Sequence, residues 1–231
     1  ESVGRRAGER AAQRLGARKI ATRQVPVLFE APLASSLLGH FASAVSGGSL
    51  YRKSSFLLDS VGQAVFSANV NIEEQPHVPK GLASAPFDEE GVATRSRDVV
   101  REGVVQGYFL SSYSARKLAL KTTGNAGGTH NLILQDTGAD FAGLLKTMGS
   151  GLLVTELMGH GVNSVTGDYS RGAAGFWVEN GAVAYPVQEI TIAGNLKDMF
   201  RSIVAVGNDV VCRGARQCGS ILIERMTVAG D

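Results

Sequence analysis

The sequence is poor in the residues that build metal and disulfide sites. Its 231 residues include two cysteines, Cys212 and Cys218, and four histidines. The cysteines have neither CxxC spacing nor the number needed for a disulfide framework, so we expect a reducing, cytoplasmic setting. The histidines are too far apart in sequence for an HExxH zinc helix, which needs two of them one turn apart. They are His40, His77, His130 and His160.

Excess charge of one sign is also absent. The formal net charge is +2, which argues against nucleic acid as a partner. Basic residues do gather near the start of the chain, at Arg5, Arg6, Arg10, Arg14, Arg18 and Lys19. A solvated helix face or a phosphate-binding surface would explain this cluster, and the first is the simpler interpretation.

Long apolar runs are missing too. The longest uncharged run, Ala31 to Tyr51, contains several serines and glycines and His40, whereas a membrane span should be mainly large and apolar. We therefore expect no membrane segment. GxSxG, GxxxxGK[ST] and Rossmann glycine patterns are absent as well, so no nucleotide cofactor is implied.

Glycine, by contrast, is abundant, with 29 residues, which favours tight turns and short strands. Apolar periodicity predicts an α+β fold: a curved antiparallel sheet or pseudo-barrel capped by helices. The expected helices cover 1–18, 32–45 (ended by Gly47 and Gly48), 115–120 (capped by Ser114), 141–148 and 195–203. The expected strands and hairpins cover 20–30, 65–72, 92–110 and 221–228, with a hairpin turn at 179–181.

Residues 151–181 combine glycines with polar and aromatic groups more densely than any other stretch. We expect Gly-rich turns carrying His160, Asp168, Tyr169 and Arg171, followed by Trp177, and we take these five as candidates for peptide or partner binding. Asp168 and Arg171 could instead pair locally across a turn, and Trp177 could belong to the core. An edge strand here would accept an extended peptide by strand addition.

Several segments carry a family resemblance. GDYSRGAAGFWVENG, YPVQEITIAGNLKDMF and VGND, with YRKSSFLLDS, GLASAPFDEEGV and SYSARKLALKTTGNAGGTHN upstream, resemble the PmbA/TldE branch of the TldD/PmbA peptidase family. The match runs from about Lys19 onward. It implies a C-terminal domain at 19–231, with 1–18 as a helix or linker from a further N-terminal domain.

The resemblance also implies a division of labour. The catalytic TldD branch carries HExxxH on the helix that corresponds to the one after Phe29, but here Phe29 and Ala34 stand where the histidines would be and only Glu30 remains. We therefore expect no metal in this chain, with zinc in a TldD-like partner and unfolded peptides as the heterodimer's substrate, in peptide maturation and proteolysis. The isolated chain could form a homodimer. His40, further along this helix, is expected to be a core or interface residue.

Two alternatives stay open. The chain could be a self-sufficient metallopeptidase with scattered ligands such as His130, His160 and Cys218. It could also be a non-enzymatic regulator of DNA gyrase, as the older family name suggests.

Overall fold

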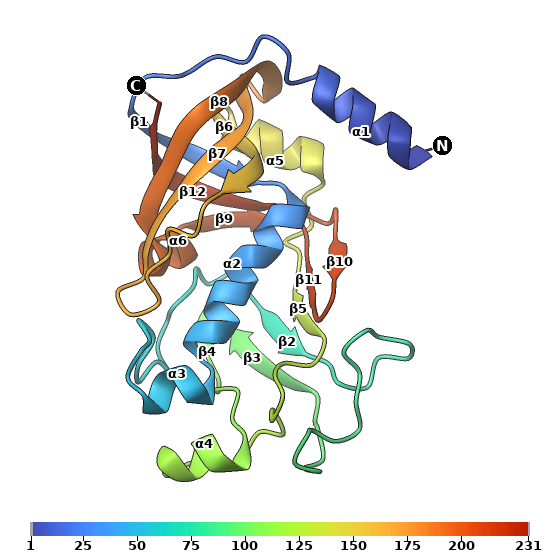
Figure 1. Cartoon of the computed structure of the whole chain (residues 1–231), viewed down its shortest axis with the longest axis vertical. Coiled ribbons are helices and arrows are strands. Elements are labelled where there is room, and N and C mark those ends of the chain that lie inside the picture. Colours follow the sequence, from blue (N-terminus) through green and yellow to red (C-terminus); the bar gives the residue numbers. More distant parts are fainter. Residues whose placement is uncertain (1, 231) are drawn as a thin grey trace.

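The computed structural model describes residues 2–230 and contains two six-stranded sheets (Figure 1). The first has the order β1-β6-β7-β8-β12-β9, and β1 also pairs with β12, so the strands from β1 to β12 close into a barrel. The second has the order β10-β11-β5-β2-β3-β4. This confirms the α+β pseudo-barrel, with one refinement: β1 and β6 pair in parallel.

The strands of the barrel sheet are β1 (Arg23–Phe29), β6 (Gly151–Met158), β7 (Asp168–Glu179), β8 (Ala182–Asn195), β9 (Ile203–Val206) and β12 (Ile221–Ala229). Those of the second sheet are β2 (Ile72–Glu74), β3 (Arg97–Arg101), β4 (Val104–Val105), β5 (Leu132–Leu134), β10 (Val211–Arg213) and β11 (Arg216–Cys218). The helices are α1 (Ser2–Ala12), α2 (Ala31–Ala44), α3 (Gly47–Tyr51), α4 (Ser112–Lys117), α5 (Phe141–Met148) and α6 (Leu196–Arg201).

Helix α2 connects the two sheets, running from the barrel to the second sheet (Figure 1). Pro32 stands in its first turn, where a missing N–H costs nothing. Its apolar stripe is buried, with Leu37 and Phe41 at 2% and 0% exposure, and the Phe41 ring meets Phe66 and Phe200 edge-on. This packing places every residue of α2 in a fixed orientation toward the strands.

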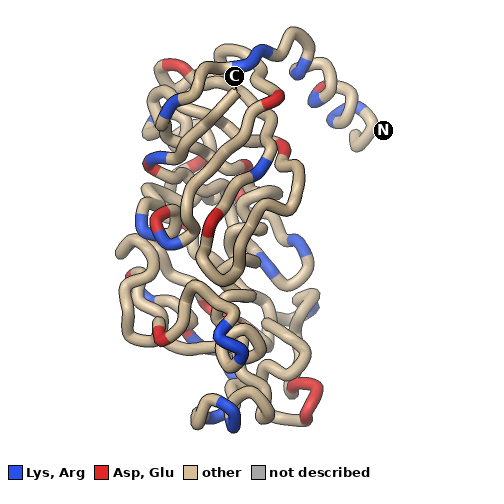
Figure 2. The backbone as a smooth tube through the Cα atoms, turned by 60° about the vertical axis from the view of Figure 1, so that its left-hand side comes forward, with Lys and Arg blue, Asp and Glu red and all other residues tan. Residues whose placement is uncertain are grey.

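Helix α1 behaves differently, because none of its residues is buried and it projects from the barrel end (Figure 1). Two ion pairs tie this region to the barrel: Arg10 with Glu30, and Arg14 with Glu156. Figure 2 shows acidic and basic residues interspersed along the chain in that view. No helix within residues 2–230 is long and apolar enough to cross a membrane.

The structure corrects several expected elements. Helix α5 has the predicted bounds, but only Ile72 of residues 65–72 lies in a strand, and α4 is capped by Ser111 rather than Ser114. Ser114 completes that capping box from the third helical position. Gly47 and Gly48 begin α3 instead of only ending α2, since Ser46 supplies a cap. Asp168, Tyr169 and Arg171, which were expected in turns, belong to the strand that covers residues 168–179.

Candidate functional site

The start of α2 is closed to a metal ion by apolar side chains. Phe29, the last residue of β1, and Ala34, in the first turns of α2, are both 0% exposed. Glu30, between them in sequence, occupies the N-cap position but does not cap with its side chain. Its carboxylate instead accepts a hydrogen bond from Arg10 Nη2 at 2.5 Å.

Cys218 of β11 completes this corner together with Ser220 and Asp209 from the neighbouring loops, but they do not form a ligand set. Burial and the Asp209 carboxylate raise the pKa of the Cys218 thiol to about 12, although Arg216 acts in the opposite direction. The thiol therefore stays protonated. Its Sγ lies 4.0 Å from the Ala31 carbonyl oxygen. Ser220 Oγ accepts from Ala31 N and donates to Asp209 Oδ2 at 2.6 Å. These bonds fix the helix start.

The scattered histidines do not supply a metal site either. His130 is buried, and its ring nitrogens lie 3.3 Å and 3.0 Å from the carbonyl oxygens of Ala83 and Gly124. His160 is exposed on the loop between β6 and β7. Within residues 2–230, no three His, Cys, Asp or Glu side chains are grouped to hold a metal ion. The residues present therefore do not fit the zinc that HExxxH proteins hold.

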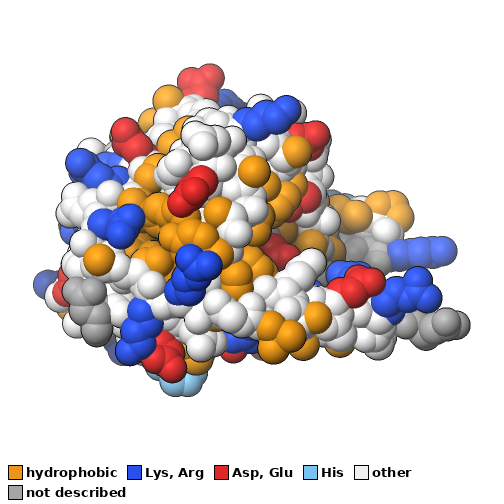
Figure 3. Space-filling model, turned by 90° about the horizontal axis from the view of Figure 1, so that it is seen from above, with side chains coloured by type: hydrophobic (Ala, Val, Ile, Leu, Met, Phe, Trp, Pro, Cys, Tyr) orange, Lys and Arg blue, Asp and Glu red, His pale blue; other side chains and the backbone are white. Residues whose placement is uncertain are grey.

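A cavity of about 940 Å³ lies beside this corner, between α1, the start of α2 and strands β6 to β8. Leu33, Leu153, Phe176 and Tyr185 line it with apolar surface, and Val183 stands at its edge with 49% exposure. Its two carboxylates form ion pairs, Glu30 with Arg10 and Glu156 with Arg14. Figure 3 looks onto this end and shows hydrophobic side chains gathered beside α1.

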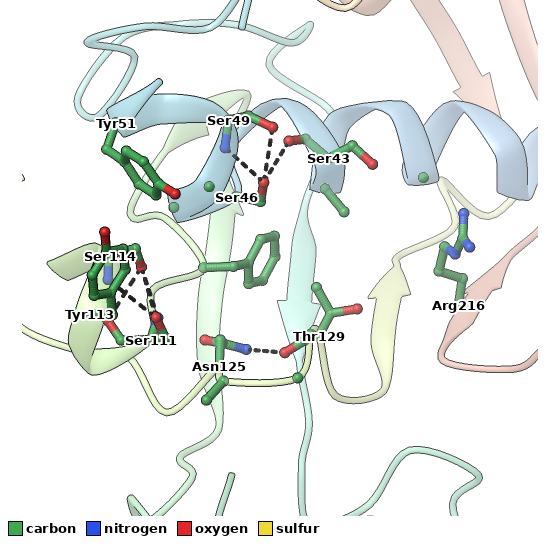
Figure 4. Close-up of a pocket in the computed structure, with 18 residues that line it drawn as sticks. Ser43, Ser46, Ser49, Tyr51, Ser111, Tyr113, Ser114, Asn125, Thr129 and Arg216 are labelled. Carbon is green, nitrogen blue, oxygen red and sulfur yellow. Dashed lines mark hydrogen bonds between the residues drawn. The ribbon is translucent and has the colours of Figure 1, made fainter. Parts of the chain in front are cut away.

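A second cavity, of about 640 Å³, lies between α2, α3, α4 and the 125–129 loop (Figure 4). Hydroxyl groups dominate its lining, and many bond one another: Ser46 Oγ donates to Ser49 Oγ at 3.1 Å, and Ser111 and Ser114 share their capping box. Figure 4 shows Arg216 at the end opposite the tyrosines. The serines serve mainly to cap the short helices.

The structure separates the five candidate binding residues. Asp168 and Arg171 lie on opposite faces of β7 because residues three apart in a strand point to opposite sides. The alternative of a local pair with Arg171 is therefore wrong. Asp168 instead accepts hydrogen bonds from Thr166 and Asn195, which lower its pKa despite some desolvation. Strand addition at β7 is also wrong, since β6 and β8 pair with its two edges.

Trp177 lies toward the other end of β7, roughly 25 Å from Tyr169 at about 3.3 Å per residue. It is 6% exposed and packs in the core, the alternative that the sequence left open. Its indole Nε1 donates to Glu179 Oε1 at 3.1 Å, and the Arg23 guanidinium lies 5.2 Å from its ring centroid. These contacts stabilise the barrel rim.

Tyr169 and Arg171, in contrast, lie close to His40, which the sequence indicated only as a core or interface residue. The His40 ring, on α2, lies 6.2 Å from the Tyr169 ring in an edge-on arrangement. Within residues 2–230, His40 Nε2, Tyr169 Oη and Arg171 Nε are buried without a hydrogen-bond partner. Periodicity alone could not have found this group, because it joins α2 to a distant strand.

Electrostatics in this group are dominated by positive charge. Burial lowers the pKa of His40, and the guanidinium groups of Arg171 and Arg216 lower it further. Burial raises the pKa of Tyr169 to about 12, with Arg171 opposing the rise. At neutral pH, His40 is therefore neutral and Tyr169 keeps its proton.

Comparisons with known proteins show to which family the chain belongs. Residues 22–230 match the model of the PmbA/TldA metallopeptidase C-terminal domain. The chain is 56% identical to metalloprotease PmbA of Escherichia coli O157:H7 over 231 residues, all of this chain and 51% of that protein. It is 51% identical to a PmbA homolog of Haemophilus influenzae over 99% of this chain and 51% of the relative. The chain thus spans about half the length of these relatives.

Solved structures agree. A proposed modulator of DNA gyrase from Thermotoga maritima is 38% identical, with a TM-score of 0.92 over 99% of this chain and 55% of that one. TldE from Thermococcus kodakarensis is 22% identical, with a TM-score of 0.85 over 98% of this chain and 55% of that one, a likeness of fold. The chain therefore belongs to the PmbA/TldA metallopeptidase family, whose C-terminal domain it carries.

Proposed function

We propose that this chain is the non-catalytic partner half of a TldD/TldE-type zinc metallopeptidase. The observation that carries the proposal is the start of α2, where Phe29 and Ala34 are fully buried apolar residues at the positions of the histidines in HExxxH. Glu30, which alone remains of that motif, is neutralised by Arg10. Zinc and the hydrolytic water would then belong to a TldD-like subunit, in a cytoplasmic heterodimer.

In this proposal, the 940 Å³ cavity contributes one wall of a cleft for unfolded peptides. Its lining suits such a substrate, because apolar side chains accept varied residues while a few polar groups orient the backbone. The closed barrel supports side-chain binding over strand addition, since strands β6, β7 and β8 have neighbours on both edges. His160 and Asp168, both exposed near the β6–β7 loop, are candidates for contact with the partner.

Metal content and peptidase activity test this division of labour. Elemental mass spectrometry of the purified chain, never exposed to chelator, should find substoichiometric zinc, nickel and iron. Activity on an unfolded peptide should appear only when a TldD-like subunit is added. One tightly bound zinc per chain, or hydrolysis by the chain alone, would contradict the proposal. The search for ligands would then begin with substitutions of His130, His160 and Cys218.

A matched pair of substitutions tests the cleft. Val183→Lys places a charge in the cavity, whereas Val204→Lys places one on β9, outside it; the two valines are 49% and 39% exposed. We expect Val183→Lys to lower peptide hydrolysis by the assembled complex at least tenfold and Val204→Lys to leave it nearly unchanged. Equal effects of the two substitutions would exclude the cavity as the peptide cleft.

A further inference from the structure

Three polar groups converge where α2 crosses β7. Tyr169 and Arg171 point to the same face of β7, because they are two residues apart in a stretch paired with β8 without a bulge. The His40 ring packs edge-on against Tyr169 from α2. Tyr169 is 1% exposed, and Arg171 lies close enough to its hydroxyl to oppose the rise that burial causes in the pKa of Tyr169. Even so, Tyr169 Oη, Arg171 Nε and His40 Nε2 make no hydrogen bond of good geometry within residues 2–230.

Such a grouping is costly in a folded protein. Buried polar groups are nearly always hydrogen-bonded, and a buried hydroxyl or guanidinium N–H without a partner destabilises the native state. Three of them in one place indicate that these donors are kept for something other than stability. A water molecule could accept their hydrogen bonds, but only an anion would also pair with the positive charge of Arg171.

The neighbouring residues do not neutralise that charge. The charged groups that act on His40 are Arg171 and Arg216, both cationic. No ion pair of either arginine occurs among the described residues, whose acidic groups bond elsewhere: Asp168 to Thr166 and Asn195, and Asp209 to Ser220. Gly39 permits the approach of Arg216, because a side chain there would collide with its guanidinium.

We infer that His40, Tyr169 and Arg171 form a receptor for a carboxylate group. A carboxylate accepts through both oxygens and carries the missing negative charge, and Arg and Tyr donors bind it with strong, charge-assisted bonds. Neutral His40 adds a third donor when Nε2 carries its proton. The carboxylate comes from the C-terminus of a peptide or from an acidic side chain of another protein.

This receptor is separate from the cavity at Glu30. His40 is ten residues further along α2, or roughly 15 Å at 1.5 Å per residue. His40 and Arg171 are both partly exposed, whereas Tyr169 is buried. The inference does not depend on the proposed partner arrangement, because the three groups need a counter-charge whichever subunit holds the zinc.

Proton NMR of the histidine Hε1 signals tests the receptor in the 231-residue chain. His40→Gln assigns the His40 signal, and the probes are N-acetyl-dialanine, its C-terminal amide, and N-acetylglutamic acid α-amide, which has only a side-chain carboxylate. We expect N-acetyl-dialanine to shift the His40 signal saturably and its amide to leave it unchanged. A response to the third probe assigns the site to acidic side chains as well, and silence restricts it to peptide C-termini.

Substitutions complete the test. Tyr169→Phe and Arg171→Gln should each raise the Kd for N-acetyl-dialanine at least tenfold, whereas Arg225→Gln, which removes a charge from an exposed position of β12, should not. Unchanged circular dichroism will show that each variant is folded. The inference is overturned if the acid and its amide shift His40 equally, if neither does, or if Arg225→Gln weakens binding as much as Arg171→Gln.

Discussion

Glu74 is the residue whose substitution should destabilise the second sheet most. It is 1% exposed on β2, and its two carboxylate oxygens accept three hydrogen bonds. Arg97 Nε donates to Oε2 at 2.9 Å, while Asn125 Nδ2 and His130 N donate to Oε1 at 2.7 Å and 2.9 Å. The carboxylate thus joins β2, β3 and the 125–130 loop.

Glu74→Gln keeps the size of the side chain but removes its charge and one acceptor. If the remaining oxygen serves Asn125 and His130, the new NH₂ group faces Arg97, donor against donor, and the arginine, 19% exposed, loses its counter-charge. Removing one partner of such a pair costs about 3–5 kcal/mol. For a chain of this size, with about 2–4 °C per kcal/mol, the Tm should fall by roughly 10 °C.

Thermal unfolding followed by circular dichroism measures the effect. Glu73→Gln is the matched control, because its partly exposed carboxylate accepts from the side chains of Gln75 and Gln135, which directly follow β2 and β5. Its cost should be about 0.5 kcal/mol or less. A double-mutant cycle with Arg97→Met should return a coupling energy of at least about 1 kcal/mol. A Glu74→Gln loss no larger than that of the control would refute the reasoning.

Three further predictions concern β7 and its neighbour α2. Gly175→Ala should unfold the barrel or cost at least about 3 kcal/mol, because its Cβ would stand 1.9 Å from a carbonyl oxygen of β6. Gly172→Ala is the control, because its Cβ would stand 3.4 Å from its nearest neighbour, and it should cost about 1 kcal/mol or less. Urea titration measures both variants. Equal losses of unfolding free energy would show that the close approach at Gly175 does not explain its effect. Tyr169→Phe removes a buried hydroxyl without a well-formed hydrogen bond, so the free energy of unfolding without ligand should stay the same or rise by up to about 1 kcal/mol. A clear fall in Tm would mean that the hydroxyl is hydrogen-bonded in the folded chain. Because burial and the nearby arginines lower the pKa of His40 below 6.5 in the folded chain, the unfolded chain binds its proton first as the pH falls. The stability contributed by neutral His40 is therefore present above about pH 6.5 and lost below it. The Tm of the His40→Gln variant should fall less than that of the parent chain between pH 7 and pH 5. If the two Tm values fall equally with pH, protonation of His40 does not limit stability.

Local signals in the sequence determined those elements that depend on neighbours along the chain. The apolar periodicity and an Asp140 cap are enough for α5, whose bounds are as predicted, and the apolar stripe and Pro32 are enough for most of α2. The alternation of the last strand likewise needs no distant contact. Replacement of the HExxxH histidines by Phe29 and Ala34 is also legible in sequence, given the family resemblance.

Only the tertiary structure decided which distant segments meet. Closure of the barrel pairs Leu28 of β1 with Leu222 of β12, a contact that depends on the twist of the whole sheet rather than on local residues. The same closure makes Asp168 to Arg171, where turns were expected, part of a central strand, because pairing on both edges satisfies the backbone of its glycines.

The carboxylate receptor depends on this closure too. Tyr169 and Arg171 share a face only because β7 is extended, and His40 reaches them only because α2 packs across the barrel. In the sequence, His40 stands far from both, and period-based reasoning has no information on contacts between elements. Sequence thus determined the family and the missing metal motif, while long-range packing decided where the unpaired polar groups gather.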